Sequence, residues 1–571
     1  MNLVKRVTIT PVFWIVMGWC LLVTVLPATA AQPDAGTFLR EFKEPPPPPR
    51  QEAKPLPEPP VSPVDDKTGV KIMVTGFDFE GLTLFSPDKL REELADLIGK
   101  ELTMSQLEVA AQRIVSFYSK RGRIATAFLP RQEVKDGRVL IKIIEGILGS
   151  VGIDPKSKSR LRPDLALSYL LRENKSGEAI NKDDLEAAVR LLKGLPGVSA
   201  STTLLPGKEK GTSDLLLQLA DTPLTSGSVE GDNHGSISSG EYRGAVALNL
   251  NNPIGYGDQF SVRAQSSIKN NYGRLAFSVP VGIVGSRLSL SSSYLHYDLG
   301  GELQSKGDAV TASGSLSYPI LRRQSFNLAG QLGYDFRWLY NEARGMPVND
   351  KTLHSGNVGL NADMSDSLLG GGSNSLTVGF GGGNVDLSAV ESDAAQDEAG
   401  PQRNRLFSKF TFNASRTQTI KENSISLSLS LNGQYALSNL DSSEQFGLGG
   451  MYAVRAYASG EASGDSGVVA SAELRQTLPG AIQAGLFYDF GWIRQNTNPW
   501  SGWNAGSEKP NEYTLDGVGL GLTWTPASWC MVKGVVATRI KSNPAADPIM
   551  GNDADGTKRE PRFWLQMVLN F

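Results

Sequence analysis

The sequence predicts a transmembrane β-barrel of about sixteen antiparallel strands, preceded by two small α/β modules and a short N-terminal helix. From about residue 225 onward, segments of about ten residues alternate apolar with small or polar side chains. That alternation is typical of barrel strands with one face on lipid and the other on a polar lumen. After residue 30 no run of 18 or more apolar residues occurs, which disfavours helical membrane spans.

The N-terminus has the features of a secretory signal peptide. Two basic residues precede an apolar stretch over 7–26, and Ala28-Thr29-Ala30 fits the small-x-small pattern of a cleavage site. We therefore predict that residues 1–30 are a signal peptide. A transmembrane anchor is the alternative, but Pro11 and Pro27 interrupt a run that is near the minimum length for spanning.

Composition narrows the class further. Removing residues 1–30 takes away two of the 56 basic residues and none of the 59 acidic ones, which leaves a net charge of −5. No basic patch suggests nucleic-acid binding. Only Cys530 remains after the signal peptide, so an intrachain disulfide is excluded and a large hydrogen-bonded framework must supply the stability.

Residues 31–44 predict one short helix, because Phe38, Leu39 and Phe42 form a small apolar face. Residues 45–70 contain a dense proline run that blocks helix and sheet, so this segment predicts a semi-rigid linker. A short helix on a long linker would be a movable element.

Two modules with the order β-α-α-β-β follow, at residues 71–146 and 147–222. In the first, Thr103 and Gln106 predict a capping box at the start of a helix. The apolar side of that helix is formed by Leu107, Ala110, Ala111, Ile114 and Phe117.

The barrel is expected over residues 223–571. Short connections alternate with long ones, which are predicted near 337–352, 384–403, 436–466, 493–513 and 541–560, as at the two rims of an outer-membrane barrel. Phe571 ends the last strand on an aromatic residue. A soluble β-sandwich or a β-solenoid is the alternative. The sixteen predicted strands are 225–233, 242–251, 258–268, 274–280, 287–297, 309–319, 325–336, 353–363, 373–382, 404–415, 423–435, 467–479, 481–492, 515–526, 530–540 and 561–571.

The longest connection, residues 436–466, is called loop 6 because it is the sixth outer loop. It contains Arg455 among glycines. We expect the loop to fold into the wet lumen and to pair Arg455 with Asp489, which lies on the next hairpin on the same strand face as Phe487 and Gly491. At about 4 Å and an effective dielectric near 20, the raw attraction is about 4 kcal/mol before desolvation.

These residues resemble motifs of a known family. Val454-Arg455-Ala456-Tyr457 is similar to the VRGY motif, and Phe487 to Gly491, with Phe490, is similar to the F/G-x-D-x-G motif, of the two-partner secretion (TpsB) transporters of the ShlB/FhaC/HecB type. Gly464 and Asp465 resemble the GDxG stretch of the same family. Position 456 is alanine where the family has glycine, so a required positive φ would cost about 1 kcal/mol.

The resemblance implies a sixteen-stranded barrel, two periplasmic POTRA domains (71–146 and 147–222), an N-terminal plug helix (31–44) and a gating loop (436–466) with the Arg455–Asp489 pair. It also implies type V secretion. A large unfolded exoprotein such as a hemolysin, adhesin or toxin would be captured by the POTRA domains and passed from the periplasm through the outer membrane of a Gram-negative bacterium. The expected capture groove lies near helix 103–120 and strand 139–145, or near strand 213–219.

Other partners are expected to be outer-membrane lipid and, during insertion, the barrel-assembly machinery, with the barrel acting as a monomeric pore. No cofactor, metal or nucleic acid is expected, and no GxxxxGK[ST] motif is present. Two alternatives are an insertase of the barrel-assembly type and a barrel hydrolase. The hydrolase is disfavoured because each of the three histidines, His234, His296 and His354, lies near a strand end without a paired acid motif.

Overall fold

The computed structural model describes residues 34–42, 71–172, 174–209, 212–300, 304–323, 325–505 and 509–571. The predicted signal peptide (1–30) and proline-rich linker (45–70) lie outside the described residues. In the described part of the chain, no helix is long and apolar enough to cross a membrane.

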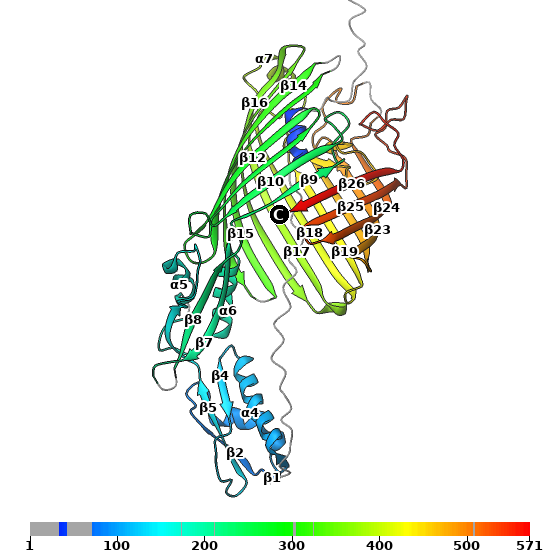
Figure 1. Cartoon of the computed structure of the whole chain (residues 1–571). Coiled ribbons are helices and arrows are strands. Elements are labelled where there is room, and N and C mark those ends of the chain that lie inside the picture. The colour runs from blue at the N-terminus through cyan, green and yellow to red at the C-terminus, as the bar shows by residue number, and fades with distance from the viewer. Residues whose placement is uncertain are drawn as a thin grey trace, which may run out of the picture.

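Sixteen antiparallel strands close into one barrel, which confirms the predicted fold class (Figure 1). Neighbouring strands follow chain order, and the first strand pairs with the last. The strands are β9 (Thr225–Asp232), β10 (Arg243–Asn251), β11 (Gln259–Ser267), β12 (Asn270–Val281), β13 (Ser286–Gly300), β14 (Ser305–Arg322), β15 (Phe326–Ala343), β16 (Met346–Asp366), β17 (Gly372–Asp386), β18 (Leu406–Lys421), β19 (Ile425–Ala436), β22 (Ser466–Leu478), β23 (Ile482–Arg494), β24 (Glu512–Ala527), β25 (Cys530–Arg539) and β26 (Arg562–Asn570).

Alternation along the strands separates a lipid face from a lumen face. On β26, Phe563, Leu565 and Met567 are exposed, whereas Trp564 between them is buried inside the barrel. Because strand side chains alternate with a period of two, one register assignment fixes the direction of every side chain on the strand. Closure also leaves no unpaired barrel edge in the hydrocarbon.

One of the predicted outer loops is not a loop. Residues 337–352 form the paired ends of β15 and β16, joined only by Arg344 and Gly345. Both turn residues have positive φ, 53° and 76°, as a tight two-residue hairpin requires. The apolar alternation is lost in this extension. The predicted strands therefore ended too early. The connection after β17 also contains an unpredicted helix, α7 (Glu391–Ala399).

The first α/β module has a mixed sheet in the order β2-β5-β4, packed against helix α4. The predicted capping box, in which Thr103 and Gln106 bond each other's backbone, is present, and all five predicted apolar residues of α4 are buried. Its elements are β1 (Lys71–Met73), β2 (Gly76–Glu80), α3 (Pro87–Glu93), the 3-10 helix η1 (Ala95–Leu97), β3 (Glu101–Thr103), α4 (Met104–Ser119), β4 (Ala125–Phe128) and β5 (Arg138–Glu145).

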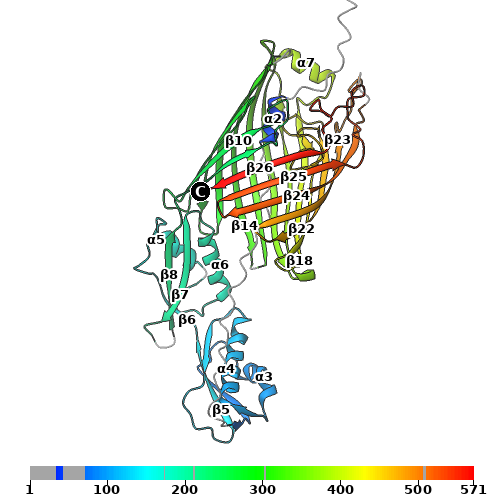
Figure 2. The same cartoon turned by 45° about the vertical axis from the view of Figure 1, so that its right-hand side comes forward.

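The second module repeats this arrangement with a sheet in the order β6-β8-β7. Ile283 of a barrel turn packs against its core, and the Arg162 amide donates to the carbonyl of Gly255 in another turn at 3.0 Å. The module therefore packs on one rim of the barrel (Figure 2). Its elements are β6 (Ile147–Ile153), α5 (Pro163–Leu171), α6 (Lys182–Lys193), β7 (Val198–Pro206) and β8 (Thr212–Asp221).

Helix α2 (Ala35–Glu41) lies inside the barrel, nearer the end opposite the α/β modules (Figures 1 and 2). Loop 6 also turns inward and contains a small hairpin of β20 (Phe446–Leu448) and β21 (Ala462–Gly464). Among the described residues, two separate chain segments thus occupy the lumen.

Candidate functional site

Loop 6 places the Arg455 guanidinium on the inner wall of β22 and β23. Nε and Nη2 donate to the two carboxylate oxygens of Asp489, each at 2.8 Å, and the Arg455 amide donates to the same carboxylate at 3.1 Å. The Asp489 side chain is fully buried and that of Arg455 is 7% exposed. Two parallel bonds between planar groups give a directional contact that a lysine could not reproduce.

Further wall residues complete this arrangement, which we call the clasp (Arg455, Ser471, Glu473, Phe487 and Asp489). Arg455 Nη1 donates to Glu473 at 3.0 Å, and Nη2 donates to the Ser471 hydroxyl at 3.1 Å. The guanidinium carbon lies 3.3 Å from the centre of the Phe487 ring, a cation–π contact. Burial would lower the pKa of Arg455, but Asp489 and Glu473 raise it overall.

Small residues allow the loop to approach the wall closely. A Cβ on Gly491 would lie 2.3 Å from Leu448 Cδ1 and 2.8 Å from Val454 Cγ2. Ala456 is not among the residues with positive φ, so alanine carries no left-handed strain there. A Cβ on Gly517 would lie 2.5 Å from that of Ala456, so the Ala456 methyl packs directly on the Gly517 backbone.

Apolar packing surrounds the clasp. Tyr457 is fully buried, and Val454, Ala456 and Tyr457 join a core with the inner faces of β22 to β26. Trp564 on the last strand donates from Nε1 to the Arg455 carbonyl at 2.8 Å. No local sequence pattern predicts this contact.

The remaining motif residues have other surroundings. Asp465 accepts from the amides of Leu440 and Thr497, at 3.0 and 2.7 Å, and so ties the base of loop 6 to the next loop. Gly464 belongs to β21, where a Cβ would lie 2.3 Å from a backbone carbonyl oxygen. Phe490 alternates with Asp489 and so lies on the opposite strand face. Phe571 exchanges backbone hydrogen bonds with Gly227 at 3.0 Å and so joins the last strand to the first.

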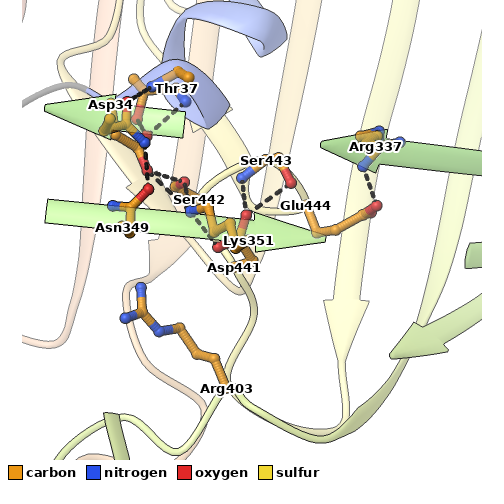
Figure 3. Close-up of polar contacts among 12 residues, drawn as sticks. Asp34, Thr37, Arg337, Asn349, Lys351, Arg403, Asp441, Ser442, Ser443 and Glu444 are labelled. Carbon is orange, nitrogen blue, oxygen red and sulfur yellow. Dashed lines mark hydrogen bonds and ion pairs between the residues drawn. The ribbon is translucent and has the colours of Figure 1, made fainter. Parts of the chain in front are cut away.

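The second lumen segment, helix α2, is held by a buried ionic cluster that we call the latch (Asp34, Lys351, Asp441 and Ser442; Figure 3). Lys351 Nζ on β16 lies 3.1 Å from Asp34 and 2.6 Å from Asp441. Ser442 donates to Asp34 at 2.6 Å. The Lys351 side chain is 3% exposed, so the lysine joins the start of the helix to loop 6 away from water.

Apolar contacts and backbone caps also hold helix α2 in its position inside the barrel, which we call its seat. Phe38 is fully buried against Tyr297, with ring centroids 4.7 Å apart, and Phe42 stacks on Tyr272. Asp34 accepts from the Thr37 amide as the helix N-cap, and the Ala35 amide donates to Asn341 at 2.7 Å. Sequence reasoning found the helix but missed the latch, because its members lie about 90 to 400 residues apart in the chain.

The pKa values of the carboxyl groups at the two ends of the helix are shifted in opposite directions. Burial would raise the pKa of Asp34, but Lys351 and the hydrogen bonds from Ser442 and Thr37 lower it overall. Burial raises the pKa of Glu41 to about 7, although Arg243 and the Ser239 hydroxyl oppose the shift. One end of the helix is therefore anchored by charge, and the other carries a carboxyl group that is costly to ionise.

One of the three histidines has a paired acid, contrary to the prediction. His296 Nδ1 lies 2.9 Å from Asp308, whereas no paired acid was expected. The two residues face each other across β13 and β14, a register contact that the local sequence does not reveal. His354 bonds Tyr334, and both ring nitrogens of His234 are buried without a hydrogen-bond partner among the described residues. Within the described ranges, no group of three or more His, Cys, Asp or Glu side chains could hold a metal ion.

Comparison with known proteins agrees with this geometry. The family model "Haemolysin secretion/activation protein ShlB/FhaC/HecB" matches residues 211–523, and the model "POTRA domain, ShlB-type" matches residues 72–146. These descriptions concern secretion rather than an enzymatic reaction, and they favour a secretion protein over an insertase of the barrel-assembly type.

Among curated proteins, the chain is 29% identical to the heme/hemopexin transporter protein HuxB of Haemophilus influenzae (strain 86-028NP), over 85% of this chain and 84% of that protein. It is 29% identical to the outer membrane transporter CdiB of Dickeya dadantii (strain 3937), over 64% of this chain and 65% of that protein. The structure of CdiB from Escherichia coli has the same fold, with a TM-score of 0.63 and 22% identity over 90% of this chain and 93% of that one. The chain belongs to the haemolysin secretion/activation protein family ShlB/FhaC/HecB and is an outer-membrane transporter of two-partner secretion, with its POTRA domains in the periplasm.

Proposed function

We propose that the protein carries an unfolded exoprotein through its barrel, and that release of helix α2 from the latch opens the lumen. The observation that carries this proposal is the position of α2 within the barrel, held at one end by a three-part ionic cluster. Helix α2 and loop 6 both occupy the lumen.

Capture of the exoprotein begins at the periplasmic modules. The strands expected beside the capture groove, 139–145 in β5 and 213–219 in β8, are the central strands of their sheets, so that expectation is wrong for edge pairing. The edge strands are β2 and β4 in the first module and β6 and β7 in the second. An extended segment can add to such an edge through main-chain hydrogen bonds, which require no fixed sequence. Binding there would hold the chain near the periplasmic rim of the barrel.

The latch is suited to a helix that must leave its seat. The N-terminal end of the helix is held by the ion pair between Asp34 and Lys351, and the helix is seven residues long. A buried ion pair contributes little net free energy when it is complete, but removing one partner costs about 3–5 kcal/mol. The helix is therefore seated specifically without being bound irreversibly.

Lys351→Met tests the proposal in planar lipid bilayers. The change removes the cation that bonds both Asp34 and Asp441, so the seated state should lose about 3 kcal/mol, which is roughly a hundredfold change in population. We expect the fraction of time that single channels conduct to rise by that order. Lys306→Met is the matched control, because Lys306 pairs with Glu342 but is 48% exposed.

Unchanged conductance in Lys351→Met, with a protein that still migrates as a folded barrel, would contradict the release of α2 as the opening step. The same recordings test the accompanying proposal that one barrel forms one pore. Conductance that always appears in equal multiples would indicate an oligomer instead.

A further inference from the structure

The two halves of the lumen wall differ in what covers them. Loop 6 packs on the inner faces of β22 to β26, where Val535 and Ala537 are buried beneath it. The periplasmic half of the opposite wall borders an open cavity of about 730 Å³, lined by residues of β10 to β16. A passing chain would therefore meet the second wall first.

Serine residues form a regular ladder on this open wall. In the register of β13 and β14, Ser289 faces Ser315, Ser291 faces Ser313 and Ser293 faces Thr311. All six lie on one face, because the positions on each strand are two residues apart. Within the described part of the chain, the hydroxyls of Ser289, Ser291 and Ser315 make no protein hydrogen bond, and Thr311 Oγ1 is buried without one.

The ladder leads directly to the seat of helix α2. The next facing pair on the same strands is Leu295 and Ala309, and both are buried in the cluster that contains Phe38 of the helix. The helix thus covers the outer end of the serine ladder, whereas loop 6 covers a different set of strands. Departure of α2 alone would extend the open wall outward.

The chemistry of the ladder fits an extended polypeptide. A serine hydroxyl both donates and accepts, so it can bond either the N–H or the C=O groups of a passing backbone. Equivalent hydroxyls recur about every 7 Å, which is also the two-residue repeat of an extended chain. Each step of the chain would exchange one weak contact for an equal one, as conduction requires.

Charged side chains at the cavity do not form a single-sign surface. Arg263 pairs with Glu230 at 2.9 Å, and Asp335 accepts from Ser313 at 2.5 Å and lies 3.9 Å from Arg337. Arg274 also lines the cavity. A segment of either charge would therefore meet no long run of opposite charge that could hold it in place.

We propose that the exported chain passes along the β13–β14 face of the lumen, on the serine ladder, while loop 6 stays docked on β22 to β26. This inference rests on the proposed function and goes beyond it, since it names the wall, the bonding chemistry and the part that does not move.

Thiol labelling in the full-length Lys351→Met channel tests the path, with Cys530→Ala removing the native thiol. The probe is an uncharged peptide of about 40 Ser, Asn and Gly residues, which behaves as a flexible coil and carries a bromoacetyl group. It is added from the periplasmic side to Ser291→Cys, Ser315→Cys or Val535→Cys proteins. We expect Ser291→Cys and Ser315→Cys to react at least about tenfold faster than Val535→Cys, because a thiol that stays buried under loop 6 is inert.

Equal labelling of Val535→Cys and Ser291→Cys would overturn the inference, since loop 6 would then have left its wall. Failure of Lys351→Met to conduct would instead contradict the proposed function. A second measurement tests the hydroxyl chemistry by counting current blockades that the peptide causes. Ser289→Leu/Ser291→Leu/Ser315→Leu should lower the blockade frequency, whereas Ser292→Leu, on the outward face, should leave it unchanged; equal frequencies in both would exclude the ladder.

Discussion

Loop 6 and helix α2 both occupy the lumen, but they are held in different ways. The clasp joins Arg455 to Asp489 through three hydrogen bonds and sits within an apolar core that reaches Trp564 on the last strand. The seven-residue helix is held by the Lys351 latch, two aromatic contacts and backbone caps. We propose from this difference that the first contact supports the barrel and the second serves as a gate.

The largest effect should come from breaking the clasp. Arg455→Ala leaves Asp489 buried and without its cation, which costs about 3–5 kcal/mol. We expect a lower urea midpoint of barrel unfolding, measured by heat-modifiable migration, together with reduced secretion. Arg494→Ala is the control, because Arg494 lies on the same strand as Asp489 but pairs with the half-exposed Glu512. Such exposed pairs contribute about 1 kcal/mol or less.

Normal secretion and unchanged conductance in Arg455→Ala would contradict a functional role for the clasp. A lower unfolding midpoint with intact gating would sharpen the comparison instead, because loop 6 would then be purely structural.

A smaller effect should follow from ionising Glu41 at the C-terminal end of helix α2. Burial raises the pKa of Glu41 to about 7 in the seated state, from 4.5 in water. The seated helix therefore binds the proton more tightly. Its extra stability is fully present below about pH 4.5 and is lost as the pH rises through about 7.

Channel opening should accordingly become about thirtyfold more frequent between about pH 5.5 and pH 8. Glu41→Gln cannot ionise and should abolish most of this dependence while leaving the Lys351 latch in place. A pH dependence that is the same in Glu41→Gln would assign the titration to another group, such as Glu461 in loop 6, where burial and Asp553 raise the pKa to about 7.

The parts of the fold that depend on local pattern could be predicted from the sequence. Alternation gave the sixteen strands, and the capping box gave the start of helix α4. Loop 6 and its arginine were identified because glycines and a motif mark them. The extended ends of β15 and β16 were missed because side chains beyond the lipid need no strict apolar alternation.

Contacts set by barrel closure could not be predicted in the same way. Lys351 meets Asp34 only because α2 enters the lumen beside β16, and Trp564 meets Arg455 only because the last strand closes against the first. The serine ladder is visible in the sequence of β13 and β14 as alternating serines, but its function depends on the register of the two strands and on which wall loop 6 covers.

Two engineered cross-links test the central claim, that α2 moves while loop 6 stays, most directly. The Phe42 ring at the C-cap of α2 stacks on Tyr272 of β12 with centroids 4.7 Å apart, and Tyr452 of loop 6 hydrogen-bonds Gln566 of β26. A bifunctional thiol reagent with a reducible spacer can therefore bridge Phe42→Cys/Tyr272→Cys as the helix lock and Tyr452→Cys/Gln566→Cys as the loop lock. With each cross-link confirmed in the Cys530→Ala protein, the helix lock should stop secretion until a reductant is added, and the loop lock should leave secretion unchanged. Secretion that continues through the locked helix, or that stops when only loop 6 is locked, would contradict the account.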